Sequence, residues 1–142
     1  MIVSCKKNDC TPAKYGYTYS ESKKIDTIQI GGNLLSTQVN PGTNIVFSYS
    51  LVAVSCPYRM DGGGERLIFE IPAGTISFNY SNADLKSITC YYENSPVGGL
   101  TKVTQGTLKG KKISNNKWDI DVNLDMPNRG STLSFANQFN RE

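Results

Sequence analysis

The most chemically equipped stretch of this sequence is a loop in which charged residues flank three consecutive glycines. Asp61 and Glu65 could supply carboxylate oxygens to a cation or a polar ligand. Arg59 and Arg66 lie just outside them and could make charge-assisted hydrogen bonds. We therefore predict a candidate ligand-binding loop. It is not a phosphate-binding loop of the P-loop type, because the Gly-Lys-Ser/Thr ending is missing. The alternative is a plain hairpin loop whose glycines merely permit the turn.

A second set of carboxylates alternates with apolar residues near the C-terminus. Asp119, Asp121 and Asp125 would lie on one face of a strand, the first two about 7 Å apart, and could share Ca²⁺. Acidic residues on the solvent-facing side of a half-buried strand are much commoner than a Ca²⁺ site there, because that side of the strand is in contact with water. We favour this solvated face and predict no metal site and no other cofactor.

Aromatic residues offer a third possibility. Tyr15, Tyr17 and Tyr19 alternate along one segment, and exposed rings of this kind can stack on sugars. Packing against the edge of the core explains the same stripe. A carbohydrate-binding module that uses exposed tyrosines is therefore one alternative function.

Enzyme chemistry is narrowed sharply by composition. The chain has no histidine, which excludes Ser-His-Asp and Cys-His triads and histidine-ligated zinc. A carboxylate pair for glycoside hydrolysis survives, but it requires a cleft that separates the two groups by about 5–9.5 Å. We expect no enzymatic activity and keep a small carboxylate-based hydrolase as an alternative. The net charge of +3 is too weak to indicate nucleic-acid binding.

The elements that must position these residues are strands. Trp118, Ile120, Val122 and Leu124 alternate with polar residues, the period-two pattern of a strand with one dry face. Turn-forming residues such as Pro41-Gly42 punctuate similar segments throughout the chain. We predict an all-β fold, an antiparallel β-sandwich of roughly eight to ten strands with little or no helix. One short helical turn is expected near residues 82–86.

The 142 residues are enough for one domain with its own core. We expect residues 1–14 to be a linker and residues 15–142 to be the domain. The predicted core comprises Ile45, Phe47, Phe69, Phe78, Trp118, Ile120, Val122 and Phe135.

The N-terminus carries a specific motif. Ile2-Val3-Ser4-Cys5, followed by Lys6-Lys7-Asn8-Asp9, resembles the lipobox and tether of Bacteroidota-type bacterial lipoproteins. The resemblance covers about nine residues and implies lipidation of Cys5 and anchoring to a membrane. It also implies an extracytoplasmic location, in the periplasm or at the outer-membrane surface. The alternative is a chance cysteine in a polar tail.

Two other cysteines lie in or beside strand-like segments. A disulfide between Cys56 and Cys90 would close a loop of about 34 residues and suit an oxidising compartment. The alternative is two buried free thiols that act as small apolar side chains.

Together these features predict a non-enzymatic cell-envelope domain with a binding or adaptor role. The expected partners are the membrane, through Cys5, and a glycan or an envelope protein, with no nucleic acid.

Overall fold

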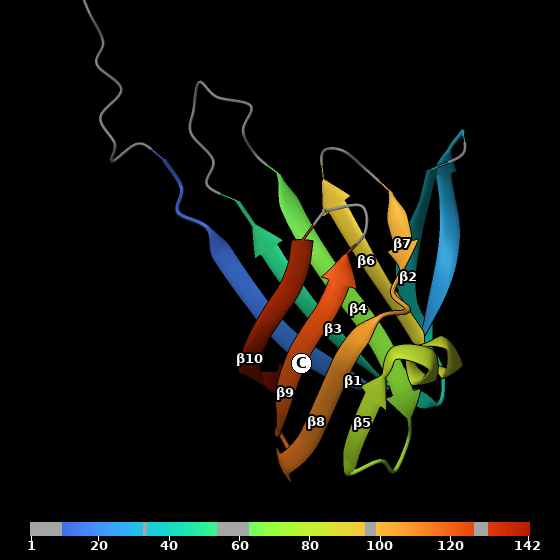
Figure 1. Ribbon diagram of the computed structural model, residues 1–142, viewed down its shortest axis with the longest axis vertical. Coiled ribbons are helices and arrows are strands. Elements are labelled where there is room, and N and C mark those ends of the chain that lie inside the picture. Colours follow the sequence, from blue (N-terminus) through green and yellow to red (C-terminus); the bar gives the residue numbers. More distant parts are fainter. Residues whose placement is uncertain (1–9, 33, 54–62, 96–98, 127–130) are drawn as a thin grey trace, which may run out of the picture.

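In the computed structural model the described residues are 10–32, 34–53, 63–95, 99–126 and 131–142, and 77% of them lie in strands. The all-β prediction is confirmed (Figure 1). The elements in chain order are β1 (Lys14–Gly31), β2 (Leu34–Pro41), β3 (Asn44–Val52), β4 (Gly64–Pro72), β5 (Ser77–Ser81), the 3₁₀ helix η2 (Asn82–Ser87), β6 (Thr89–Ser95), β7 (Leu100–Lys102), β8 (Gly106–Ser114), β9 (Lys117–Met126) and β10 (Ser131–Arg141).

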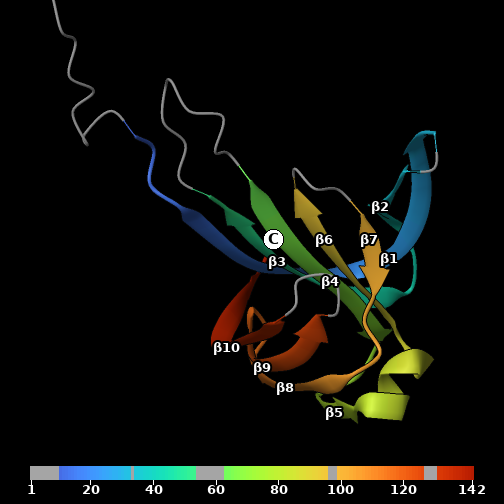
Figure 2. The same ribbon diagram turned by 45° about the horizontal axis from the view of Figure 1, so that its top comes forward.

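All ten strands belong to one hydrogen-bonded sheet, in the order β5-β8-β9-β10-β1-β3-β4-β6-β7, with β2 attached to β1. The sheet is curled, so that β8, β9 and β10 lie across from β1, β3 and β4 (Figure 2). The predicted sandwich of two sheets is therefore not confirmed. The two halves are joined by a short parallel pairing of Thr18 with Asn140 and Tyr19 with Arg141, whereas the other strand pairs are antiparallel.

The main core fills the inside of the curl. β9 alternates strictly between exposed and buried residues, because a strand turns successive side chains to opposite faces. The ring centroids of Phe47 and Phe69 are 4.9 Å apart, and the Trp118 ring meets Phe47 edge-on at 5.3 Å. Of the predicted core, seven residues are buried and Phe135 is half-buried.

Close packing explains one glycine in this core. A Cβ on Gly110 would lie 2.4 Å from ring carbons of Phe78 and 2.8 Å from the Ile120 side chain. Only a residue without a side chain therefore lets β5 and β9 pack around β8. The predicted helical turn is confirmed as η2, whose Leu85 is fully buried.

β1 is a single strand that bends in the middle. Its first half pairs with β3, and its second half pairs with β2. The bend coincides with a register irregularity between Ser20 and Lys23, where Ser22 has a φ of 56° and its carbonyl accepts from the Gly42 N–H at 3.2 Å. The second half of β1 therefore leaves the main sheet and forms a hairpin with β2.

The β1–β2 hairpin covers the outer face of the sheet. Ile25 of the hairpin packs with Val46 of β3 and Ile68 of β4 in a second small core. The Glu70 carboxylate reaches up from β4 and accepts a hydrogen bond from the Ile25 N–H at 3.0 Å. β3 and β4 are thus covered on both faces, which explains their nearly continuous apolar sequence.

Candidate functional site

The predicted ligand loop is only partly described. Arg59 and Asp61 lie outside the described residues. Glu65 and Arg66 are neighbours in β4, and alternation along the strand sends their side chains to opposite faces. Glu65 contacts residues of the main core, whereas Arg66 contacts the hairpin.

Glu65 is held by two phenols. The hydroxyl of Tyr49 donates to Oε1 at 2.8 Å, and the hydroxyl of Tyr92 donates to Oε2 at 2.6 Å. Burial, and then the hydrogen bond to Glu65, raise the pKa of Tyr49 above its ordinary value. The Tyr49 phenol is therefore protonated at neutral pH and remains a donor to the carboxylate. Cross-strand neighbours supply the three groups from β3, β4 and β6.

Arg66 belongs to a polar network beneath the hairpin. It lies directly opposite Glu93 in the β4–β6 register, and its Nη1 donates to Thr37 Oγ1 at 3.4 Å. Glu93 Oε1 accepts from the Thr37 N–H at 2.9 Å, the Thr37 hydroxyl at 3.1 Å and the Ser36 hydroxyl at 3.2 Å. This network fixes β2 above the sheet and places a cation beside an anion.

A groove of about 350 Å³ lies between the hairpin and the adjoining ends of β3, β4 and β6. Its charged lining includes Glu65, Arg66 and Glu93. Its apolar lining consists of Ile30, Leu35, Leu51 and Val52. Charged lining residues beside an exposed apolar rim suit an amphipathic ligand.

The rim is unusually apolar for a solvent-facing surface. Ile30 is 61% exposed, Val52 is 59% exposed and Leu35 is 49% exposed. Ile30 and Leu35 lie in segments whose sequence gives no sign of this groove. Their isolated period-two pattern indicates strands, and it cannot say whether another layer covers them.

The tyrosine stripe divides between core and surface. Tyr19 is buried, and its hydroxyl donates to the Asn115 carbonyl at 3.0 Å. Tyr17 packs against Tyr49 and Phe135, each with ring centroids 5.5 Å away. Tyr15 is 61% exposed and pairs with Leu51, which lines the groove. The stripe therefore leaves one exposed ring, opposite Leu51 in the β1–β3 register.

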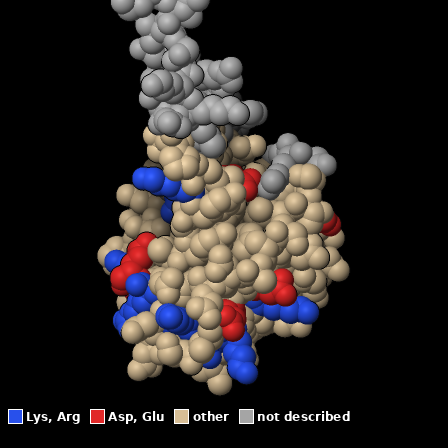
Figure 3. Space-filling model, turned by 90° about the vertical axis from the view of Figure 1, so that its left-hand side faces the viewer, with Lys and Arg blue, Asp and Glu red and all other residues tan. Residues whose placement is uncertain are grey.

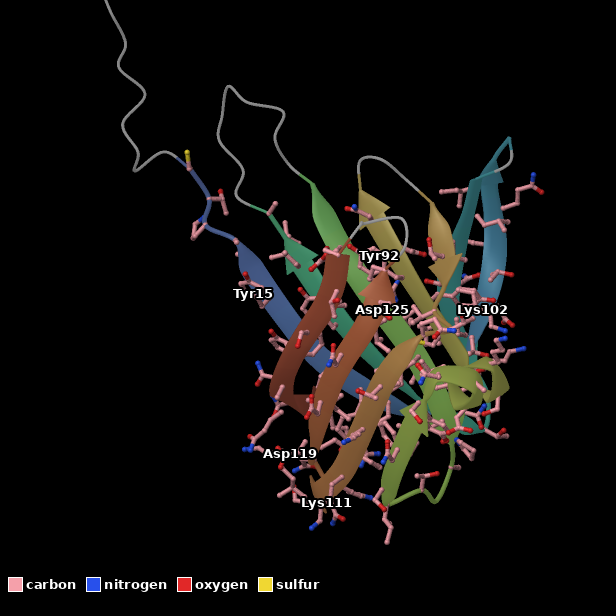
Figure 4. The ribbon with its side chains drawn as sticks, viewed as in Figure 1. Tyr15, Tyr92, Lys102, Lys111, Asp119 and Asp125 are labelled. Carbon is pink, nitrogen blue, oxygen red and sulfur yellow. The ribbon has the colours of Figure 1, made fainter. Side chains whose placement is uncertain are left out.

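The aspartate row lies on the exposed face of β9, and none of its three residues lines the groove. Asp119 pairs with Lys111 and Asp121 pairs with Lys109 across the β8–β9 ladder, and these four residues line a shallow trough of about 540 Å³. Figure 4 shows Asp119 and Lys111 close together at the bottom, well away from Tyr92. Within the described ranges, no group of three or more His, Cys, Asp or Glu could hold a metal ion.

The predicted disulfide between Cys56 and Cys90 is wrong. Cys90 is a free thiol with 0% exposure, packed in the main core between the two halves of the sheet. Burial raises the pKa of this thiol from 9.0 to about 12, so it acts as a small apolar side chain. Cys56 and the predicted lipidation residue Cys5 lie outside the described residues.

No family model, curated protein or solved structure matches this chain. Among the described residues, no helix has both the length and the apolar character needed to cross a membrane.

Proposed function

We propose that this chain is a non-enzymatic binding or adaptor domain of the bacterial cell envelope, tethered to a membrane through Cys5. The observation that carries the binding role is the groove between the β1–β2 hairpin and the sheet. It unites Glu65 and Arg66, two residues of the predicted ligand loop, with Glu93 and an apolar rim.

The groove suits recognition because its charged groups are held in place. Thr37 and Ser36 of the hairpin donate to the Glu93 carboxylate, and Arg66 donates to the Thr37 hydroxyl. Side chains that are already ordered lose little conformational freedom when a ligand binds, which favours affinity. A rigid sheet carries all of them, as is typical of binding sites on β scaffolds.

The tether is tested by fractionation of cells that express the complete gene. Wild-type protein should sediment with membranes, and the Cys5→Ser variant should be released to the soluble fraction. Thr11→Ala is the control, because it changes the same segment outside the lipobox-like motif and leaves Cys5 in place. A soluble wild-type protein would refute the tether.

The groove is tested by NMR titration of the 142-residue chain with CaCl₂, oligosaccharides and short apolar peptides. Binding should shift the amides of Glu65, Arg66 and Glu93, and the Val52→Asp variant should weaken the response. Ile76→Asp is the control, because Ile76 is also exposed but lies at the opposite end, in the turn between β4 and β5. Shifts confined to Lys109, Lys111, Asp119 and Asp121 would instead move the site to the trough on β8 and β9.

A carbohydrate-binding module is the second candidate, and the exposed ring of Tyr15 is the observation that favours it. Stacking on a sugar needs an accessible aromatic face. Of the three tyrosines in the stripe, only Tyr15 has an exposed ring. Titration with oligosaccharides should then shift Tyr15 and Leu51 most, and Tyr15→Ala should abolish the response. Equal responses of wild type and Tyr15→Ala would reject this candidate.

A further inference from the structure

Exposed apolar side chains concentrate at one end of the molecule. Among the described residues, seven large hydrophobic side chains are exposed: Tyr15, Ile28, Ile30, Leu35, Val52, Ile76 and Ile113. Ile30, Leu35 and Val52 line the groove, Ile28 precedes it on β1, and Tyr15 pairs with the groove residue Leu51. We call these five residues the apolar end. It comprises the start of β1, the end of β3 and the hairpin, toward the top of Figure 1.

Charged side chains of the described residues favour the other end. Lys112 and Arg141 approach Glu21 at 4.0 and 3.1 Å, and Lys111 and Asp119 lie at the bottom of Figure 4. On the side that carries β1 and β10, most acidic and basic side chains gather toward the bottom of the view (Figure 3). The molecule therefore has a more apolar end and a more charged end.

The chain enters the domain at the apolar end. β1 begins at Lys14, whose cross-strand partner in β3 is Val52, a residue of the groove rim. The segment that leads back to Cys5 therefore joins the domain beside the exposed apolar residues. A lipid on Cys5 would hold this end close to the membrane.

We infer that the apolar end docks on the lipid surface of the membrane, with Ile30, Leu35 and Val52 entering the interfacial region. This inference rests on the proposed tether for its orientation, because a lipid on Cys5 would turn this end toward the bilayer, while the exposed apolar side chains supply the affinity for it. Insertion of apolar side chains into the acyl boundary removes them from water. The charged end then faces away from the bilayer.

The observations favour a lipid surface as the occupant for two reasons. The exposed apolar side chains lie beside the attachment point of the proposed anchor, so membrane contact needs no further encounter. Two described basic residues lie at the apolar end: Lys14, opposite Val52, and Arg66, which lies opposite Glu93. Docking should therefore depend mainly on apolar contact and little on anionic lipid.

The test is flotation of the full 142-residue chain, without lipid on Cys5, with vesicles of neutral phosphatidylcholine. Wild-type protein should float with the vesicles, and Ile30→Asp and Leu35→Asp should each weaken partitioning by about ten-fold or more. Ile76→Asp and Ile113→Asp place the same charge at the opposite end and should leave partitioning unchanged. Addition of phosphatidylglycerol, or of salt to about 0.5 M (roughly three times physiological ionic strength), should change partitioning by less than about two-fold.

Wild-type protein that does not float would overturn the inference, as would equal flotation of all four variants. The apolar end could instead bind a second copy of this chain, which analytical ultracentrifugation of the free chain tests. A dimer that dissociates in the Ile30→Asp variant would assign the apolar end to self-association. The vesicle result is independent of lipid on Cys5. If the chain does not float but the protein in cells sediments with membranes, the docking is rejected and the proposed tether stands. If the chain floats but the protein in cells is soluble, the tether is rejected.

Discussion

The Glu93 carboxylate takes the place of a neighbouring strand for β2, because its Oε1 accepts the backbone N–H of Thr37 at 2.9 Å. The same oxygen accepts the Thr37 hydroxyl, and Thr37 is the one polar residue among the buried side chains of the described chain. An edge N–H that would otherwise lack a partner beneath the hairpin is thereby satisfied.

Removal of this acceptor should loosen the hairpin. We expect Glu93→Ala to lower the free energy of unfolding by about 1.5–3 kcal/mol, because the bonds involve a charged group and leave a buried N–H unsatisfied. Hydrogen exchange should accelerate at the Thr37 amide. Glu142→Ala is the control: Glu142 also accepts two hydroxyls, from Thr18 and Ser20, but at an exposed site, so little change is expected. Unchanged exchange at Thr37 would contradict the role of Glu93.

The two phenols on Glu65 should act together. Tyr49→Phe and Tyr92→Phe each remove a hydrogen bond to the carboxylate, and each should cost about 1–3 kcal/mol of unfolding free energy. Because both bind one carboxylate, the double variant should deviate from additivity by more than about 0.5 kcal/mol. Chemical denaturation of the four proteins measures this coupling. Strictly additive losses would mean that each phenol acts independently of the other.

Trp118 combines large burial with an unsatisfied donor. Its indole N–H has no acceptor among the described residues, although the ring is fully buried. Trp118→Ala should cost about 3–5 kcal/mol through the lost packing. Trp118→Phe should cost clearly less, since it keeps an aromatic ring and removes the orphaned donor. Thermal denaturation distinguishes the two variants, and equal losses would show that the N–H carries no penalty.

Cys90 should make the protein sensitive to alkali. Its pKa is raised from 9.0 to about 12 by burial, so above pH 9.0 the thiol ionises in the unfolded chain before it ionises in the folded one. Ionisation of the unfolded state lowers stability as pH rises from 9.0 toward 12, and has no effect below that range. The Cys90→Val variant lacks this contribution. The free energy of unfolding of the wild type, relative to that of the variant, should therefore be constant up to pH 9.0 and then fall as the pH rises further. A difference that stays constant at every pH would contradict the assignment.

The β1–β3 register offers a replacement for the incorrect disulfide. Lys14 pairs with Val52 and Tyr15 with Leu51, so the same register continued by four residues would bring Cys10 opposite Cys56. Directly opposed residues in antiparallel strands have Cα atoms about 4.5–5.5 Å apart, within the range of a disulfide. We expect protein from an oxidising compartment to yield a Cys10–Cys56 crosslinked peptide in non-reducing mass spectrometry. Alkylation of both thiols without reductant would contradict this.

The local sequence pattern was sufficient to predict the strands of this fold. Alternation along residues 117–126 predicts both the strand and its buried face, because the period of a strand is fixed by the backbone. Turn chemistry predicts the break at Pro41-Gly42, and the aromatic residues predict most of the core. Every one of these inferences depends on neighbours in sequence.

The candidate site depended on contacts between distant segments. Period-two alternation places Glu65 and Arg66 on opposite faces of a strand, whereas strand pairing places Tyr49 and Tyr92 beside Glu65 and Glu93 opposite Arg66. The bend at Ser22 turns the second half of β1 over the sheet and creates the groove, and nothing in the local pattern marks it. Cys90 lies in a strand in either case; only the curl of the sheet, which closes over it from both halves, makes it a buried free thiol. Secondary structure follows from the local backbone, whereas a site follows from which strands the hydrophobic core brings together.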